Sequence, residues 1–299
     1  MKTLETLQRK INTAEKLFAT VKTMKTLAAA NMKQYDKAVE SLGQYHHTIE
    51  LGLQAVLQDV DFSGEMLQDN PVSPFSGETQ QIMAIVFGSD HGFAGRFNDD
   101  IVSFAFKILN ETNIEKDHRV VICIGEQAAS RILYREQPVE KLFEVPNSIS
   151  GINPLIHKIL LEIESLRINN QHLQVWLFYN KPAYGTMVTQ EIDMIIPIEL
   201  TKYQVPRSQW PSRSTPIYTI ERGKLLSALI QQHIFVMLYG GAAFSLAAEN
   251  ASRLAAMQLA SKNIEELLVA IQVEFRQNRQ NAITEELLDI AAGAMAFET

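Results

Sequence analysis

Proline is missing from both ends of this chain. All ten prolines of the 299 residues lie between Pro71 and Pro216, so the first 70 and the last 83 residues contain none. A proline inside a helix costs about 3 kcal/mol. Two long proline-free ends are therefore compatible with two very long helices that enclose a folded middle domain.

Cysteine and net positive charge are also scarce. The single cysteine, Cys123, lies in the apolar run VVICI and predicts a buried, reduced thiol in a cytosolic protein. A net charge of -7 gives no reason to expect nucleic acid as a partner. The longest apolar stretch, Ile234–Ala248, is shorter than the roughly 18 residues of a membrane span. We expect it to be the most buried part of a long helix, without direct membrane insertion.

Motifs that carry chemistry are missing as well. The segment GSDHGFAGRFN, from Gly88 to Asn98, is rich in glycine, but its spacing fits neither the dinucleotide fingerprint nor the Walker loop. It predicts a tight turn between a strand and a helix, and nucleotide binding is the less favoured alternative. The pairs Asp90–His91 and Asp99–Asp100 are neighbours that do not converge, and no metal-ligand spacing accompanies them. We expect no catalytic residue, no cofactor and no metal site.

What the sequence has is heptad periodicity. Apolar residues recur in alternating steps of three and four, and Lys25 and His46 are the polar exceptions. The series is Leu4, Leu7, Ile11, Ala14, Phe18, Val21, Lys25, Ala28, Met32, Tyr35, Val39, Leu42, His46, Ile49, Leu53, Val56 and Val60. Such a sustained period of 3.5 is typical of a coiled coil. A core helix of a globular bundle is the alternative, but typical globular helices have only about 8–20 residues.

The C-terminal end shows a second stripe on a predicted helix from Gly223 to Phe297. Its members are Ala247, Asn250, Leu254, Met257, Ser261, Ile264, Leu268, Ile271, Phe275 and Asn278. Two such long helices can bury their stripes economically only against each other, which predicts an antiparallel pair. Clustered alanines allow the helix axes to approach closely. Gly240–Gly241 is where we expect a bend.

The middle of the chain alternates between strand and helix patterns. The predicted strands are Ile82–Phe87, Val120–Ile124, Leu173–Tyr179 and Met187–Ile196, and the predicted helices are Asn98–Leu109, Glu126–Tyr134 and Pro154–Leu166. This order predicts a mostly parallel, Rossmann-like α/β domain enclosed by the antiparallel coiled coil. The expected parts are a coiled-coil helix (1–60), a linker (61–79), the α/β domain (80–201), a linker (202–216) and a coiled-coil helix (217–299).

Three blocks, in the same order, resemble the gamma-subunit family of F-type ATP synthases. The longest begins at Ala247 and reads AAENASRLAAMQLASKNIEELLVAIQVEFRQNRQNAITEELLDIAAGAMAF. It is similar to the family's Asn-x-x-Arg-Gln and Ile-Thr-x-Glu-Leu motifs. The other two are VKTMKTLAAANM, from Val21, and the GSDHGFAGRFN segment, which is similar to Ser-x-Asp-x-Gly-Leu-Cys-Gly-x-x-Asn. The resemblance runs nearly from end to end.

The resemblance implies a central rotor shaft that couples proton or sodium translocation to ATP synthesis or hydrolysis, without a catalytic site of its own. The implied partners are the alpha and beta subunits, the epsilon subunit and the membrane c-ring. The implied location is peripheral, on the cytoplasmic face of a bacterial or archaeal cell membrane. Carried over by motif, the residues that contact the catalytic ring are Met24, Arg253, Arg279, Gln280, Thr284 and Glu286.

Some positions depart from the family pattern. Where the family frequently has Arg-Gly-Leu-Cys-Gly, this chain has His91-Gly92-Phe93-Ala94-Gly95. Where the family has Arg-Met, this chain has Arg253-Leu254. These departures resemble a divergent branch, such as that of an alternate ATPase operon, and leave the transported ion and the net direction open. Two other functions remain as alternatives. One is a homodimeric coiled-coil scaffold whose α/β domain binds a ligand or partner, and the other is a nucleotide-binding enzyme with helical extensions.

Overall fold

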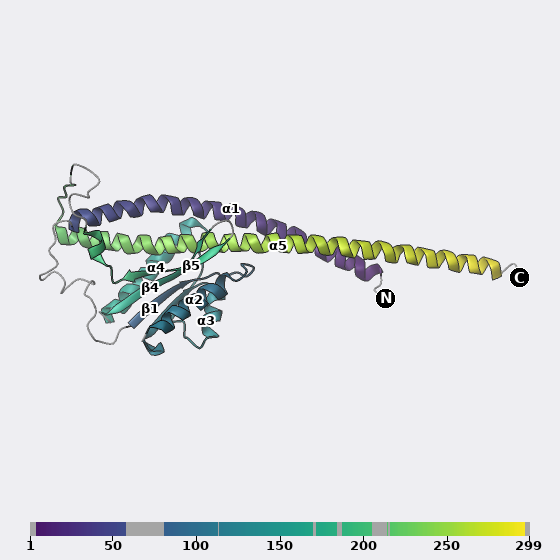
Figure 1. Cartoon of the computed structure of the whole chain (residues 1–299), viewed down its shortest axis with the longest axis horizontal. Coiled ribbons are helices and arrows are strands. Elements are labelled where there is room, and N and C mark those ends of the chain that lie inside the picture. The colour runs from purple at the N-terminus through teal and green to yellow at the C-terminus, as the bar shows by residue number, and fades with distance from the viewer. Residues whose placement is uncertain are drawn as a thin grey trace. The chain divides into compact units, whose positions relative to one another are not determined.

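A computed structural model describes residues 4–57, 81–112, 114–169, 172–183, 187–204, 214 and 216–296. Two very long helices begin and end this part of the chain, as Figure 1 shows. The elements are α1 (Leu4–Leu57), β1 (Gln81–Phe87), α2 (Phe97–Glu111), η1 (Lys116–His118), β2 (Arg119–Ile124), α3 (Glu126–Leu133), β3 (Lys141–Phe143), η2 (Ile149–Gly151), α4 (Ile152–Asn169), β4 (Leu173–Pro182), β5 (Val188–Ile196), η3 (Leu200–Tyr203) and α5 (Arg222–Ala296), where η denotes a 3-10 helix.

The chain divides into two compact units. One consists of Met1–Ala28 with Arg253–Thr299, and the other is Ala29–Ser252. Both α1 and α5 contribute residues to each of the two units. The predicted linker 61–79 and most of the predicted linker 202–216 lie outside the described residues.

The larger unit is built on a five-stranded sheet of order β3-β2-β1-β4-β5. Strands β1 to β4 are parallel to their neighbours, and only β5 runs antiparallel, against β4. Alternation along each strand sends side chains to two faces. In β1, Met83, Ile85 and Phe87 pack with α4, α5 and α1, whereas Ala84 and Val86 pack with α2 and α3. The predicted α/β fold with a mostly parallel sheet is confirmed.

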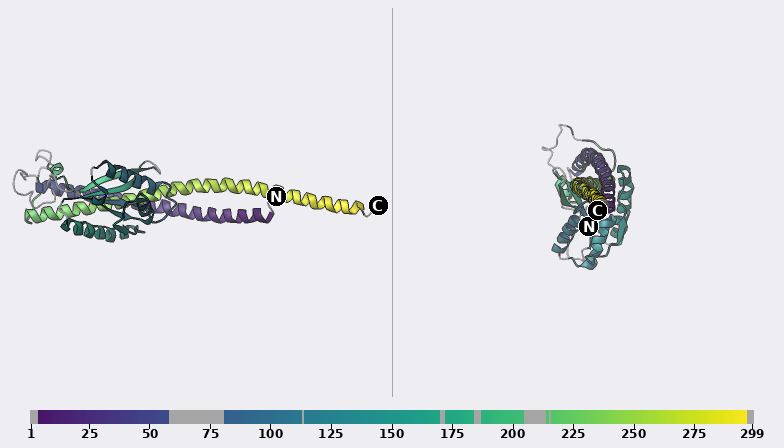
Figure 2. Two further views of the ribbon diagram at one scale, coloured as in Figure 1. Left: turned by 90° about the horizontal axis from the view of Figure 1, so that it is seen from below. Right: turned by 90° about the vertical axis from the view of Figure 1, so that its right-hand side faces the viewer.

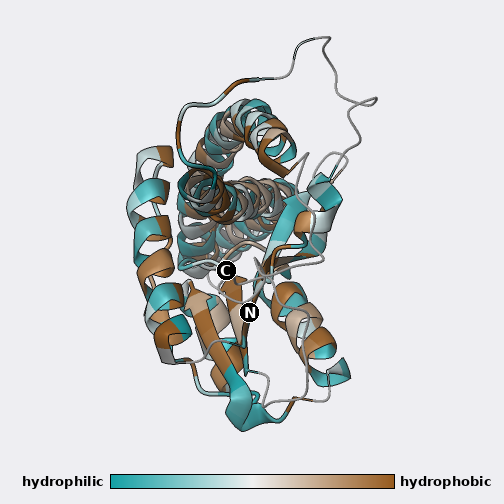
Figure 3. Cartoon of the chain, turned by 90° about the vertical axis from the view of Figure 1, so that its left-hand side faces the viewer, coloured by the Kyte–Doolittle hydropathy of each residue, from teal (hydrophilic) through white to brown (hydrophobic). Residues whose placement is uncertain are grey.

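Both faces of the sheet are therefore covered, which explains its composition. Buried strands read as nearly continuous apolar runs when helices lie on both sides. In β1 every residue after Gln81 is buried, and β2 ends in the buried run Val121–Ile124. Figure 3 shows brown, hydrophobic stretches of strand between the flanking helices.

Within the larger unit, α1 and α5 run antiparallel side by side (Figures 1 and 2). Near one end of the pair, the Arg222 guanidinium donates two hydrogen bonds to the Val56 carbonyl oxygen, at 2.6 and 3.1 Å. Further along, the Tyr45 hydroxyl donates to the Gln232 side-chain oxygen at 2.9 Å. The residue numbers fall on α1 as they rise on α5, which establishes the antiparallel direction.

In the smaller unit, the first turns of α1 pack against the C-terminal half of α5. Leu7, Ile11 and Ile271 form a small buried cluster, and Leu268 and Phe275 pack against it. This is the side-by-side arrangement that the two stripes predict.

The heptad positions behave as expected in both units. Every predicted position from Leu4 to Val56 is buried or half-buried except Lys25, and Val60 lies outside the described residues. None of the predicted stripe positions from Ala247 to Asn278 is exposed. The apolar period therefore identified the inner sides of both helices.

The paired glycines of α5 serve close packing. The helix continues through Gly240–Gly241, where we expected a bend, without interruption. A Cβ added to Gly241 would lie 2.6 Å from a methyl group of Leu177, and one on Gly240 would lie 3.3 Å from a methyl group of Leu42. Glycine lets α5 approach both the sheet and α1.

The apolar stretch of α5 lies in the core of the larger unit. By length and hydropathy α5 is the one helix, among the described residues, that could cross a membrane. However, most of Ile234–Ala248 is buried against the sheet and α1. This burial agrees with the expectation that the stretch is the most enclosed part of the helix.

Candidate functional site

The six predicted contact residues all belong to the smaller unit. Met24 lies on α1 and is half-buried. The other five lie on α5, where Arg253 is half-buried and the rest are exposed. The exposed four are Arg279, Gln280, Thr284 and Glu286. Thus four of the six fall within two turns of one helix, and their side chains face solvent.

The end of α5 has no packing partner in the described chain. The last α1–α5 cluster is formed around Leu7 and Ile271, with Phe275 at its border. Beyond it, every residue from Arg279 to Ala291 is exposed. The Thr284 hydroxyl donates a hydrogen bond to the Gln280 carbonyl oxygen at 2.9 Å, one turn back, so this contact lies within α5 itself.

Large apolar residues occupy this exposed end as well. Ile283, Leu287, Leu288 and Ile290 are 47%, 61%, 63% and 64% exposed. The residues at 283, 287 and 290 follow the i, i+4, i+7 spacing, so they share one face of the helix. Apolar residues grouped on a surface mark an interaction site. The sequence analysis missed these four, although their spacing was visible, because only the register with α1 reveals that no described residue covers them.

We call the exposed part of α5, from Arg279 to Ala291, the terminal segment. It carries both signs of charge, with Arg279 near its start and Glu285, Glu286 and Asp289 further on. It therefore offers hydrogen-bond donors, carboxylate acceptors and an apolar face on a single helix. Such a surface suits recognition by a protein partner, and it brings together no nucleophile and base that could catalyse a reaction.

The glycine-rich GSDHGFAGRFN segment is a tight turn whose polar groups are already engaged. The backbone N–H of Ser89 donates to Asn98 Oδ1 at 2.9 Å, and Asn98 Nδ2 donates to Ser89 Oγ at 2.8 Å. Phe93 and Gly95 adopt positive φ values of 64° and 59°, which reverse the chain direction. The predicted strand-to-helix turn is confirmed.

Carboxylates occupy the places where a phosphate would bind. Asp90 Oδ1 accepts a hydrogen bond from the Glu126 backbone N–H at the start of α3 (3.1 Å), and Oδ2 accepts from the Val145 N–H (2.7 Å). The first turn of α2 carries Asp99 and Asp100. A helix N-terminus attracts anions through its free N–H groups and its dipole. With carboxylates at both N-termini, a nucleotide phosphate would meet repulsion and an N–H that already has a partner.

The two acidic neighbours do not form a metal site. Asp99 pairs with Arg131 at 2.6 Å, and Asp100 pairs with Arg96 at 3.2 Å. Each carboxylate is therefore turned toward its own guanidinium. No group of three or more potential metal ligands occurs among the described residues.

The crevice where an α/β sheet usually binds ligands is filled. It lies at the carboxyl ends of the strands where the strand order reverses, here between β1 and β4. Ala94 and Phe97 pack there against Ala248 of α5, and all three are at most 3% exposed. Asn180, fully buried, donates from Nδ2 to the Phe97 carbonyl oxygen at 3.2 Å.

Cys123 lies in β2 and is fully buried. Burial, with a smaller contribution from the negative charge of Asp90, raises the pKa of its thiol to about 12. A nucleophilic cysteine needs a thiolate at physiological pH. Cys123 is therefore a core residue, as its apolar surroundings in the sequence predict.

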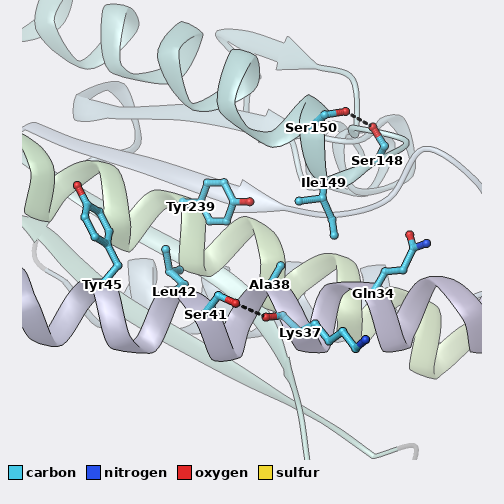
Figure 4. A pocket seen from close by; sticks show the side chains of 10 residues that line it. All are labelled: Gln34, Lys37, Ala38, Ser41, Leu42, Tyr45, Ser148, Ile149, Ser150 and Tyr239. Carbon is cyan, nitrogen blue, oxygen red and sulfur yellow. Dashed lines mark hydrogen bonds between the residues drawn. The ribbon is translucent and has the colours of Figure 1, made fainter.

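One pocket of about 840 Å³ opens in the larger unit between α1, η2 and α5 (Figure 4). Its polar lining is mostly hydroxyl groups, and Lys37 is its only charged side chain. Two of the hydroxyls, Ser148 and Ser150, bond to each other at 2.9 Å, and Ser41 donates to the Lys37 carbonyl oxygen at 3.0 Å. The pocket lacks the paired acid and base of a hydrolytic site.

Comparison with known proteins gives one consistent result. The family model described as ATP synthase matches residues 3–297. The chain belongs to the ATP synthase family. Among curated relatives, the ATP synthase gamma chain of Geobacter metallireducens is 26% identical over 303 residues, which cover 100% of both chains. That of Chlorobium phaeobacteroides is 24% identical and covers 100% of this chain and 99% of the relative.

Solved structures of ATP synthases share the fold. The rotor of the Euglena gracilis mitochondrial ATP synthase aligns over 94% of this chain and 98% of that chain, with a TM-score of 0.61 and 11% identity. The central stalk and c-ring structure from Tetrahymena thermophila covers 81% of this chain, with a TM-score of 0.56 and 18% identity. The resemblance to gamma subunits of this family, predicted from three sequence blocks, is confirmed.

Proposed function

We propose that this chain is the central rotor shaft of an F-type ATP synthase or ATPase and couples ion translocation to ATP synthesis or hydrolysis. The match of an ATP synthase family model to residues 3–297 carries this proposal. The fold supports it, because α1 packs along α5 in both units, and the larger unit adds a five-stranded α/β sheet.

The terminal segment of α5 would act by asymmetry. Ile283, Leu287 and Ile290 lie on one face of the helix, and Glu285 and Asp289 lie on the opposite face. A ring of similar subunits around such a helix would meet a different face at each position. As the helix turns, each subunit would exchange polar contacts for apolar ones. A ligand or partner shifts a conformational equilibrium only through such a difference in contact energy between the two states.

We assign ring contact to the six residues that the family motifs identify, Met24, Arg253, Arg279, Gln280, Thr284 and Glu286. The exposure of the last four supports the assignment, because their side chains are available to a partner. Arg279 can donate charge-assisted hydrogen bonds to carboxylates or carbonyl oxygens, and Glu286 can accept them. These bonds would form and break with the angle of the shaft.

The proposed partners are alpha and beta subunits around the helix pair, and an epsilon subunit and a membrane c-ring at the α/β unit. A net charge of -7 gives this chain no reason to bind nucleic acid. We infer a peripheral location on the cytoplasmic face of a cell membrane, without direct insertion. The burial of Ile234–Ala248 within the larger unit supports a soluble position for the most apolar part of α5.

We infer that the chain has no catalytic site of its own. The carboxylates of Asp90, Asp99 and Asp100 at the N-termini of α3 and α2 support this inference, as does the filled crevice at the switch point. A homodimeric scaffold is less favoured. The heptad stripe of α1 is covered by α5 of the same chain, so a second copy would have to displace an intact helix pair.

Reconstitution tests the proposal. The chain is combined with alpha, beta and epsilon subunits and the membrane sector, and ATP-driven ion pumping into vesicles is measured with and without it. We expect pumping only when the chain is present, and no ATP hydrolysis by the purified chain alone. Pumping by a complex that lacks the chain, or robust hydrolysis by the chain alone, would overturn the proposal.

A further inference from the structure

Two histidines stack on each other in the core of the larger unit. The rings of His46 on α1 and His233 on α5 have centroids 5.4 Å apart and planes inclined by 26°. Tyr203 of η3 meets His233 edge-on, with centroids 5.6 Å apart, and its hydroxyl lies 3.4 Å from His233 Nε2. One imidazole therefore joins three elements that are distant in the sequence.

The surroundings of His233 suit a neutral imidazole. His233 is only 4% exposed. The nitrogens His46 Nε2 and His233 Nδ1 are buried and have no hydrogen-bond partner among the described residues. A proton added to His233 Nδ1 would create a buried N–H donor without an acceptor, and a positive charge next to the His46 ring. Both changes are unfavourable in a site that excludes water.

We propose that the His46–His233 stack is an acid-sensitive latch that holds α1 and η3 on α5 at neutral pH and releases them when His233 becomes protonated. The latch follows from the geometry, since three elements meet at a buried ring that has no acceptor for an added proton on Nδ1. Release would begin locally, where α1 and η3 face His233, while the sheet keeps its own core.

The charged and titratable groups near the latch come from each element that packs there. On α1, Glu50 lies one turn from His46, and its carboxylate is 3.8 Å from His47 Nδ1. At η3, Glu199 and Lys202 form an exposed ion pair at 2.6 Å, and burial followed by the charge of Glu50 raises the pKa of Tyr203.

On α5 the residue next to His233 is Gln232, whose side-chain oxygen accepts from Tyr45. On α4, His157 contacts Phe235 rather than the stack, with ring centroids 5.8 Å apart. Glu50 is therefore the one carboxylate among these neighbours that could partly compensate a charged ring. Removing its charge should make the latch more sensitive to acid.

The direction of the pH effect follows from linkage. Burial, and next the neighbouring His46, lowers the pKa of His233 from 6.5 to about 4. Between these two values an open state binds a proton that the closed state excludes. The contribution to closure is complete above about pH 6.5 and is lost as the pH falls toward 4. With allowance for water that enters the site, we expect closure to weaken about tenfold between pH 7.5 and pH 5.0.

Hydrogen–deuterium exchange of the full chain tests this proposal. Wild type is compared with His233→Phe, which keeps a stacking ring but cannot titrate there, at pH 7.5 and at pH 5.0. After correction for intrinsic rates, wild-type peptides from residues 42–53 and 226–237 should lose about tenfold more protection on acidification than those of His233→Phe. Peptides from β2, residues 119–124, should behave alike in both proteins.

His47→Phe is the matched control. It alters a histidine next to the stack on α1, whose side chain is 70% exposed, and it should respond to acid as wild type does. Equal acid responses in wild type and His233→Phe would overturn the proposal. So would a His47→Phe chain that loses the response as fully as His233→Phe.

A second measurement needs no variant and remains decisive if His233→Phe does not fold. The seven histidines of the wild-type chain are titrated by NMR through their ring signals. We expect at least one histidine to stay neutral at pH 5.0 until protection of residues 42–53 is lost. If all seven become protonated with pKa values near 6.5 while this segment stays protected, the latch does not exist.

Discussion

Replacing Arg279 and Gln280 together with alanine should disturb assembly or coupling and leave the rest of the chain intact. Both side chains are exposed on α5, in the terminal segment that no other described element covers. Removing them from the isolated chain therefore breaks no packing contact. We expect the free energy of unfolding to change by no more than about 0.5 kcal/mol, as for most surface substitutions.

In the assembled complex the expected cost is larger. Hydrogen bonds to a charged group contribute about 1.5–3 kcal/mol each, because the interaction is stronger and the partner is left unpaired when it is lost. A loss of this size corresponds to about a tenfold to hundredfold shift between docked and undocked contacts. Such a shift should appear in coupling, where a contact must hold at one shaft angle and not at another.

The assay is ATP-driven ion pumping by the reconstituted double variant, normalised to assembled complex, with ATP hydrolysis measured in parallel. The chain provides its own control, because Arg276 and Gln277 repeat the same pair three residues earlier and are also exposed. The Arg276→Ala, Gln277→Ala variant should pump nearly as wild type does. Wild-type assembly and pumping by the Arg279→Ala, Gln280→Ala variant would refute the contact assignment. Equal losses of pumping in the two variants would contradict the claim that the ring contact is specific to Arg279 and Gln280.

Three further predictions concern the apolar end, the turn and the glycines. Leu287→Ser with Ile290→Ser should leave thermal stability nearly unchanged, because both side chains are over 60% exposed, but should reduce co-purification with alpha and beta subunits. Asp90→Ala removes the acceptor of two backbone N–H groups and should cost about 1–3 kcal/mol in urea unfolding, whereas Asp100→Ala at an exposed ion pair should cost under about 1 kcal/mol. Gly88→Ala should lower the free energy of unfolding by about 1–3 kcal/mol, because its Cβ would lie 2.2 Å from that of Ala128. Gly43→Ala, on an open part of α1, should raise the free energy of unfolding by about 0.5–1 kcal/mol, and equal effects of the two substitutions would refute this interpretation.

The sequence was most informative where a period repeats over many turns. The heptad positions identified the buried side of α1 with one exception, Lys25, and the predicted strands and helices of the middle domain correspond to observed elements. Strand β3 was missed because it has only three residues at the edge of the sheet, two of them exposed. So short a strand depends on pairing with β2, and it has no period of its own.

Features that depend on register could not be predicted. His46 is a polar member of the heptad series, but nothing in the sequence says that His233, almost 190 positions away, lies opposite it. The same holds for Asp90, whose two N–H donors come from α3 and from the segment after β3. In each case the partner is fixed by tertiary packing, which the spacing of residues along one segment does not encode.

The register also explains why the candidate site is found at the end of α5. In the smaller unit α1 contributes residues 4–28, whereas α5 contributes residues 253–296, about 20 more. At 1.5 Å per residue, the surplus is a helix of roughly 30 Å that α1 cannot cover. Fully burying a leucine or isoleucine side chain is worth about 1.5–3 kcal/mol, so the four exposed apolar residues there represent stabilisation that the isolated chain does not use. A partner that encloses the terminal segment would gain it, and the charged residues interspersed among the apolar ones would make that gain depend on which face is presented.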